Sequence, residues 1–226
     1  MKDKFYIVEM PKYAILIFIL LSLVAMYLYP GGTLNNPNQE HYSFIHNFFS
    51  DLGTTVSYSG VDNMVSCIIF NSSLCIIGVS FLLLFLKIRT LFSQYRILSI
   101  IGSMLGIFSG LCFIGVGFTP ADTSIDPHVF FAHWIFRSLF IVSIIYSILI
   151  FKSEGFDNKY AFGFIIFGVM VLAYVVYSEL MLRDPRQFPE DLMKHVIAQK
   201  MIVFWLLASI YIYSKGLARY INNKLQ

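Results

Sequence analysis

The chain has 226 residues, of which 58% are hydrophobic and only 13% are charged, and its formal net charge is +3. A soluble domain usually carries about 25% charged residues. Apolar runs of more than about 18 residues, long enough to cross a bilayer, cover most of the sequence. These properties exclude a soluble enzyme, a nucleic-acid-binding module and a disordered segment. They predict an integral membrane protein whose partners are membrane lipids and not nucleic acids.

Six apolar segments, each expected to be a transmembrane helix, follow one another along the chain. They cover residues 13–29, 64–86, 97–118, 129–151, 160–182 and 196–213. The first follows Lys2, Lys4 and Lys12, as a secretory signal would, but no small-residue cleavage site comes after it. The sequence therefore predicts an all-α, polytopic membrane protein, with a single domain over residues 1–226 built as a six-helix bundle.

The distribution of Lys and Arg predicts the orientation of this bundle. Eleven of the sixteen basic residues lie in the two termini and in the second and fourth loops: Lys2, Lys4, Lys12, Lys87, Arg89, Arg96, Lys152, Lys159, Lys215, Arg219 and Lys224. The first and third loops contain none, whereas the fifth loop is an exception, with Arg183, Arg186, Lys194 and Lys200. Because basic loops stay in the cytoplasm, both termini are expected to be cytoplasmic. The expected location is the inner membrane of a bacterium.

Small and polar residues inside the segments predict helix contacts. Gly102, Gly106 and Gly110 are spaced four apart and form a smooth stripe that allows another helix to approach closely. The stripe is interpreted as a contact inside the bundle, with a homo-oligomer or partner-subunit interface as the alternative. Asn71, near the middle of the second segment, is expected to hydrogen-bond to a neighbouring helix.

Residues capable of acid–base and metal chemistry collect on the expected outer side. All five histidines lie there, His41, His46, His128, His133 and His195, together with nine of the thirteen acids. Imidazole changes charge near neutral pH and is the commonest metal ligand. This segregation is the strongest functional signal in the sequence.

Within the long first outer loop, residues 43–53 have helical periodicity. Ser43 is the expected N-cap and Gly53 the expected end of the helix. The apolar Ile45, Phe48, Phe49 and Leu52 fall on one face, and the polar His46, Asn47, Ser50 and Asp51 fall mostly on the other. The pattern predicts a short amphipathic helix in the membrane interface, either as a plain lid or as one wall of a pocket.

Arg137 is expected about two turns inside the outer boundary, one turn from His133 on the same helix face. An unpaired cation at such a depth costs at least ~2.5 kcal/mol, so Arg137 needs a partner or a wet cavity. Two interpretations stay open. Arg137 forms an ion pair with Glu179 that fastens two helices, or it holds a lipid head-group phosphate.

The outer ends of several segments are expected to form one polar pocket. Its candidate residues are His46, Ser50, Asp51, Asp122, His128, His133, Arg137, Glu179, His195, Gln199 and Lys200. His195 and Gln199 share a helix face, whereas Lys200 is expected to extend outward to water.

A zinc site is one possible use of this pocket. His46, His128, His133, His195 and Asp51 are the candidate ligands, and Asp51 and His133 are the candidate catalytic residues. Such a set would leave an open position for an activated water. However, His128 and His133 are five residues apart, which is not a same-face spacing on a helix, and the sequence has no HExxH motif.

Short motifs in the outer loops resemble a known family. They are Asn47-Phe-Phe-Ser50-Asp51-Leu-Gly53, Phe70-Asn71, and Gly117-Phe-Thr-Pro120-Ala-Asp122 followed by His128 and His133. The chain resembles bacterial and archaeal six-span membrane proteins catalogued as a domain of unknown function, which are distantly similar to the DRAM-type membrane proteins. The resemblance implies a six-helix bundle and membrane-lipid organisation, and it brings no defined reaction. The alkaline-ceramidase-like zinc hydrolases use similar residue types, but on seven spans and with a His-x-x-x-His pair that this chain lacks.

Two functional hypotheses follow. In the first, an outward-facing His/Asp/Arg pocket binds or senses lipid head groups. In the alternative, the protein is a zinc-dependent membrane hydrolase that acts on a lipid-like substrate.

Overall fold

The computed structural model describes residues 4–180 and 183–224, and its body consists of long helices. They are α2 (Met10–Leu28), α3 (Met64–Ile88), α4 (Arg96–Phe118), α5 (Ile125–Lys152), α6 (Phe162–Leu180) and α7 (Leu192–Lys224). Each of the apolar segments predicted from the sequence overlaps one of these helices, although residues 181–182 of the fifth segment lie outside the described residues and α7 continues eleven residues beyond the predicted end at 213. Shorter helical turns are η1 (Phe5–Glu9), η2 (Phe49–Gly53), η3 (Arg89–Tyr95), η4 (Asn158–Ala161) and η5 (Pro189–Asp191).

Within the described residues, five helical stretches are long and apolar enough to cross a membrane. One of them, Met64–Phe118, contains both α3 and α4. These two helices turn back on each other at η3, where Phe92 leaves helical geometry with φ −111° and ψ 42°. The fold is therefore an all-α bundle with the composition of an integral membrane protein.

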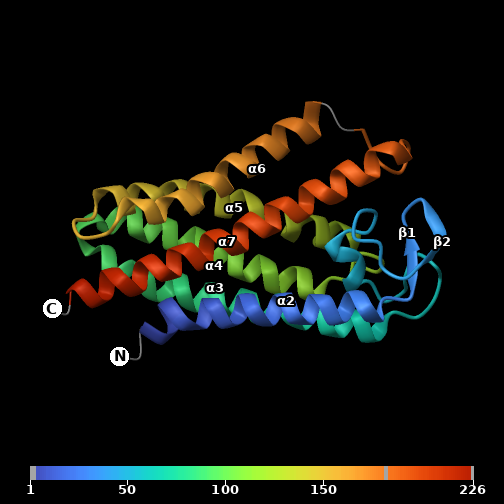
Figure 1. Ribbon diagram of the computed structural model, residues 1–226, viewed down its shortest axis with the longest axis horizontal. Helices are drawn as coiled ribbons and strands as arrows, with labels where there is room; N and C mark the ends of the chain where they lie inside the picture. Colours follow the sequence, from blue (N-terminus) through green and yellow to red (C-terminus); the bar gives the residue numbers. More distant parts are fainter. Residues whose placement is uncertain (1–3, 181–182, 225–226) are drawn as a thin grey trace.

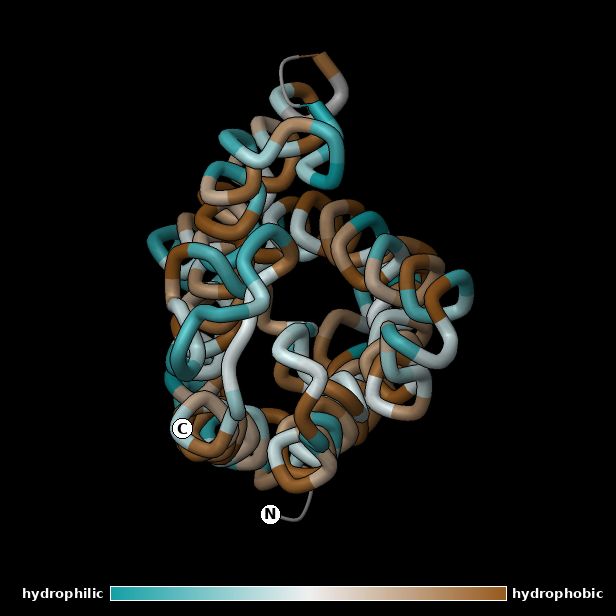
Figure 2. Tube along the Cα trace, turned by 90° about the vertical axis from the view of Figure 1, so that its right-hand side faces the viewer, coloured by the Kyte–Doolittle hydropathy of each residue, from teal (hydrophilic) through white to brown (hydrophobic). Residues whose placement is uncertain are grey.

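The long helices run side by side, with both termini at one end of the bundle and the first loop at the other (Figure 1). We call the end with the termini the inner end and the opposite end the outer end. Seen along the bundle, the helices are arranged around a common centre (Figure 2). The outer half of α6 stands away from its neighbours in both views.

The glycine stripe of α4 lies inside the bundle, as its first interpretation proposed. A Cβ atom on Gly106 would overlap the ring of Phe85 on α3, and one on Gly110 would lie 2.8 Å from the carbonyl oxygen of Gly78. Gly102 faces Tyr146 on α5 in the same way. The glycines thus allow α4 to pack closely between α3 and α5.

The first loop begins with a hairpin that the sequence analysis did not predict. Strand β1 (Gly31–Thr33) pairs antiparallel with β2 (Asn36–Glu40). Gly32 has φ +82°, and a Cβ atom there would overlap the backbone nitrogen of Ser59. Glycine is required here because the backbone is left-handed and another segment of the loop touches it.

The predicted amphipathic helix over residues 43–53 is wrong. Residues 44–46 form a turn, Phe48 is extended with ψ 160°, and only Phe49–Gly53 is helical, as a 3₁₀ turn. The Asp51 side chain is the physical reason, because it accepts a hydrogen bond from the Phe48 amide at 2.9 Å and so takes the donor that a continuous helix would need. The expected polar face is turned inward, with Asn47 0% and Asp51 4% exposed.

The expected bond from Asn71 to a neighbouring helix is also wrong. Its Nδ2 donates to the carbonyl of Gly53 at 3.1 Å, so this polar group in α3 holds the loop and not another helix.

The close packing of α4 on α3 predicts the effect of Gly106→Ala. The added methyl group would overlap the Phe85 ring, and overpacking of this kind costs about 1–3 kcal/mol. We expect a lower midpoint of thermal unfolding in detergent micelles. Adding Phe85→Leu should restore part of the loss, whereas Met104→Ala, at an exposed position of α4, should change the midpoint little. A stabilising effect of Gly106→Ala would contradict this packing.

Candidate functional site

The first loop is held on the bundle by the buried amide of Asn47. Its Nδ2 donates to the carbonyl of Gly32 at 2.9 Å and to Asp51 Oδ2 at 3.0 Å. Its Oδ1 accepts from the amide of Ser43 at 2.9 Å. The side chain therefore connects the β-hairpin, the 43–46 turn and η2, and a buried amide with this many partners fixes their relative positions.

Lys200 of α7 reaches the same point, which corrects the expectation that it extends outward to water. The side chain is only 6% exposed, and Nζ donates to the backbone carbonyl of Asn47. The ammonium group also lies 4.9–5.4 Å from the centres of the rings of Tyr42, Phe44 and Phe49. Aromatic faces stabilise a desolvated cation, so Lys200 fastens α7 to the loop and is not free to bind a head group.

Side chains of α3 bind the other side of the loop. Asn63 donates to the carbonyl of Thr54 at 2.8 Å, and Ser66 donates to that of Leu52 at 3.1 Å. On α7, Gln199 Oε1 accepts from the amide of Phe49 at 2.9 Å. Polar residues of the helices thus replace water for the backbone of η2, which is why this loop can enter an apolar bundle.

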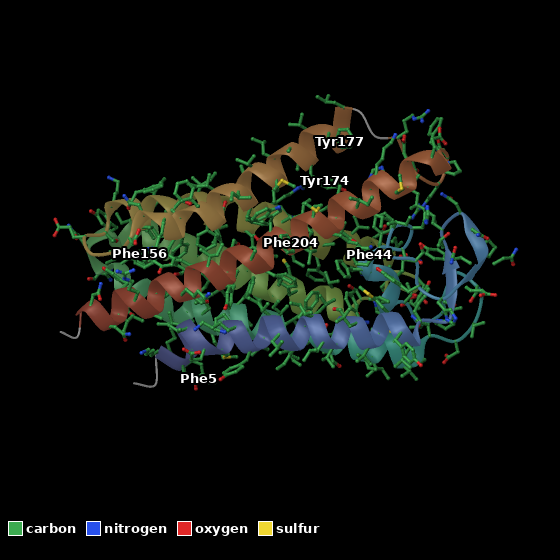
Figure 3. All side chains as sticks on the ribbon, viewed as in Figure 1. Phe5, Phe44, Phe156, Tyr174, Tyr177 and Phe204 are labelled. Carbon is green, nitrogen blue, oxygen red and sulfur yellow. The ribbon has the colours of Figure 1, made fainter. Side chains whose placement is uncertain are left out.

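A cavity of about 450 Å³ lies beside this loop at the outer end, between α5, α6 and α7. We call it the outer cavity. Its polar lining residues are Ser50, Asp51, Tyr58, His128, His133, Tyr174, Asp184, Arg186 and Gln199. Figure 3 labels Tyr174 on the outer half of α6. Five of the residues predicted for the pocket are therefore brought together: Ser50, Asp51, His128, His133 and Gln199.

Two acceptor atoms, each on a largely buried side chain, are available on the wall of the outer cavity. Asp51 Oδ2 accepts from Asn47 and from the Phe48 amide at 2.9 Å, and no described residue donates to Oδ1. His128 Nδ1 lies 2.7 Å from the carbonyl of Thr119, which can only accept, so Nδ1 carries the proton. In the neutral ring Nε2 then remains an acceptor, without a partner among the described residues.

Asp51 titrates closer to neutrality than an ordinary carboxyl group. Burial raises its pKa from 3.8 to about 6, although the hydrogen bonds from Asn47 and Phe48 and the charge of Lys200 act in the opposite direction. At neutral pH the carboxylate is therefore mostly ionised and can accept two more hydrogen bonds from a ligand.

A smaller apolar cavity of about 80 Å³ lies deeper in the bundle, and we call it the inner chamber. It shares Ser50, His128, Ala132, Phe136 and Gln199 with the outer cavity, and its other lining residues are apolar. The site therefore passes from a polar mouth to an apolar interior.

Three predicted pocket residues are used by the loops instead and do not line the outer cavity. His46 Nδ1 lies 3.1 Å from Ser43 Oγ, and His195 Nε2 lies 3.1 Å from the carbonyl of Arg183. Asp122 Oδ2 accepts from the amide of Thr55 at 2.9 Å and from that of Val56 at 3.0 Å, which ties the third loop to the first. Partial burial alone would raise the pKa of Asp122, but these hydrogen bonds hold it below the usual value.

Arg137 is exposed on α5 and lies 6.0 Å from the centre of the Trp134 ring. It makes no hydrogen bond or ion pair with a residue that the structure describes. The side chain of Glu179, its expected partner, lies outside the described residues. The ion pair between them stays a prediction.

The five candidate zinc ligands do not form a cluster. In the described part of the chain, no three side chains of His, Cys, Asp or Glu are placed so that they could hold a metal ion. His46, His128 and His195 instead bind Ser43, Thr119 and Arg183.

Two of the four basic residues of the fifth loop, Arg183 and Lys194, have local acidic partners. Arg183 binds Asp191 at 3.0 Å and Glu190 at 2.7 Å, and Lys194 binds Asp191 at 2.6 Å. Asp191 is only 1% exposed, so these pairs hold η5 against the start of α7. Half of the basic residues that form the exception to the charge distribution are thus used in structural ion pairs.

The sequence analysis missed Tyr58, Tyr174, Asp184 and Arg186 as lining residues of the outer cavity. Arg186 and Asp184 were seen only as charges in the fifth loop, and the two tyrosines carry no local pattern. Their place depends on how the first loop, α6 and the fifth loop meet, which spacing along the chain does not report.

Comparison with protein-family models, with curated proteins and with solved structures gave no match for the chain. The resemblance to the six-span family and to the DRAM-type proteins stays a prediction.

The buried carboxyl of Asp51 predicts a pH-dependent stability. Its folded-state pKa lies above that of the unfolded chain, so its stabilising contribution is full below pH about 4 and is lost as the pH rises through about 6. Relative to the wild type, Asp51→Asn should therefore gain stability over this range, by up to about 3 kcal/mol. Thermal unfolding in detergent at a series of pH values measures it.

Asp62→Asn is the matched control, because this carboxyl is exposed in the same loop. The gain should not occur in that variant. Parallel stability curves for wild type and Asp51→Asn would contradict the prediction.

Proposed function

We propose that the protein is a six-span membrane protein whose outer cavity binds the polar head group of a membrane lipid. The main support is that the polarity of the lining changes along the site. The outer cavity, of about 450 Å³, has a polar mouth, and the inner chamber, which shares five lining residues with it, is apolar. Sites for small ligands combine apolar walls with a few convergent polar groups. An amphiphile is the ligand that matches both parts.

The polar atoms favour a head group that can both donate and accept hydrogen bonds. Asp51 Oδ1 and His128 Nε2 need donors, such as hydroxyl or ammonium groups. The amide nitrogen of Gln199 and the guanidinium of Arg186 are donors, because Gln199 uses its oxygen on Phe49 and Arg186 lines the mouth. A hydroxylated or zwitterionic head group satisfies both walls, whereas an apolar ligand would leave buried acceptors unpaired.

The orientation of the chain supports access from outside the cell. The two termini and the loops η3 and η4 lie at the inner end, where the basic residues are concentrated, and the cavity lies at the other end (Figure 1). With α3 and α4 as separate crossings, α2–α7 give six spans with both termini in the cytoplasm.

The proposal predicts that filling the wall shared by the two cavities will reduce lipid binding. Ala132 lines both cavities, and Ala132→Phe places a ring between them. Lipid retained by the purified protein, measured by native mass spectrometry, should fall about tenfold, as for a loss of about 1.4 kcal/mol. Val65→Phe, at an exposed position of α3, should retain wild-type occupancy. No bound lipid on the wild type, or equal occupancy in both variants, would contradict the proposal.

The six-span arrangement predicts the accessibility of single introduced cysteines. Asn38→Cys, in the exposed β2 strand, should react with a membrane-impermeant maleimide on intact cells. Glu154→Cys, in the exposed loop before η4, should react only after permeabilisation. The wild type measures the background from Cys67, Cys75 and Cys112. The reverse pattern would refute the orientation.

A further inference from the structure

One face of α5 carries polar and apolar residues in an ordered sequence. His133, Arg137, Phe140, Ile144 and Ile148 are spaced three or four residues apart and therefore lie on the same side of the helix. The first of them lines the outer cavity, and the last three line an open groove between α5 and α6. Arg137 lies between the two.

Arg137 is placed at a depth where a cation needs an anion. It follows residue 129, the outer end of the predicted membrane span, by eight residues, or about 12 Å along the helix at 1.5 Å per residue. This is well inside a hydrocarbon layer about 30 Å thick. The guanidinium is exposed beside Trp134 and has no hydrogen bond or ion pair with the described residues. A phosphate group would supply both the charge and the paired acceptors that a guanidinium prefers.

The contact between α5 and α6 loosens outward from this level. Gly168 of α6 packs on Ser143 and Phe140, and a Cβ atom on Gly168 would lie 2.9 Å from Ser143 Oγ. The next turn of α6 outward, at Leu172, lines the α5–α6 groove together with Phe140. Leu172 is 53% exposed and Val176 is 49% exposed. The outer half of α6 stands away from its neighbours (Figure 1) and lines the outer cavity with Tyr174, so we expect a lipid to reach this cavity from the side.

The groove below Arg137 suits an acyl chain. Its volume is about 280 Å³, and nearly all of its lining is apolar, including Phe140, Ile144 and Ile148 of α5 and Ile165 and Leu172 of α6. The inner chamber, at about 80 Å³, is smaller than a cavity of about 150 Å³ that holds one benzene ring. The inner chamber can thus hold only a small apolar part of the ligand next to the head group, and a full acyl chain fits along the groove.

We infer that the ligand of the outer cavity is a bilayer phospholipid that enters sideways between α5 and α6. Its phosphate binds Arg137 and His133, its head group lies in the outer cavity, and an acyl chain lies in the α5–α6 groove. This assignment rests on the proposed function and adds the phosphate, the route and the position of the tail.

Titration of the purified full-length protein with phosphatidylglycerol or diacylglycerol, followed by native mass spectrometry, tests this inference. Arg137→Gln should weaken phosphatidylglycerol binding about tenfold, as for loss of a charge-assisted bond, and leave diacylglycerol binding unchanged. Arg137→Lys should restore part of the affinity. A purely structural role of Arg137 would change both lipids equally and would overturn the inference.

Two further arms separate the remaining explanations. Glu179→Gln should not change the preference for phosphatidylglycerol, and a clearly stronger preference in that variant would show that Arg137 is paired with Glu179 in the wild type and would overturn the inference. Inorganic phosphate should not displace the lipid, and full displacement would identify a site for free anions.

A photoreactive side chain at Leu172 should crosslink the bound lipid more strongly than one at Leu111, an exposed position of α4, and equal yields would overturn the route.

Ala132→Phe distinguishes failure of this inference from failure of the proposed function. If Ala132→Phe abolishes binding of phosphatidylglycerol while Arg137→Gln has no effect, the cavity binds the head group and the lateral phosphate site is wrong. If neither variant changes binding, the proposed function itself is wrong.

Discussion

The buried amide of Asn47 is the constraint on which the outer end of the molecule depends. A side-chain amide that loses contact with water must bond all of its polar atoms, and Asn47 does so with Gly32, Ser43 and Asp51. Its backbone carbonyl receives Lys200. One residue thus ties the hairpin, the loop and α7 together, and the wall of the outer cavity, which carries Asp51, exists because this loop is held inside the bundle.

Polar groups at the outer end have two uses, and their hydrogen bonds distinguish them. His46, His195, Asp122 and Lys200 are bonded to backbone atoms or hydroxyl groups of the loops, and they shape the site without facing it. Asp51 and His128 each use one polar atom in a hydrogen bond within the protein, and the other polar atom of each side chain remains an acceptor on the cavity wall. Asp51 and His128 are therefore the residues that are available to bind a ligand. The first group explains why so many polar residues are needed around a modest cavity.

The long helices and about half of the cavity residues could be predicted from the sequence. Apolar runs of bilayer length have few other stable structures in lipid, because backbone groups there must be bonded within the segment. Ser50, Asp51, His128, His133 and Gln199 were found because they lie next to helix ends on one side. Tyr58 and Tyr174 were not found, because nothing in their neighbourhood along the chain marks them as facing a cavity.

The sequence by itself determined the membrane class, the positions of the long helices and the expected orientation, since these depend on local hydrophobicity and on charge counts, whereas it placed the end of α7 eleven residues too early. Only the tertiary structure decided that Asn47 and Asp51 face inward, that Lys200 is enclosed by aromatic rings and that an apolar groove lies between α5 and α6, one turn of α5 from Arg137. Periodicity reports which side chains share a face, but it does not report what covers that face. Burial of a polar residue depends on partners such as Gly32 and Lys200, which are distant along the chain and meet it only after folding.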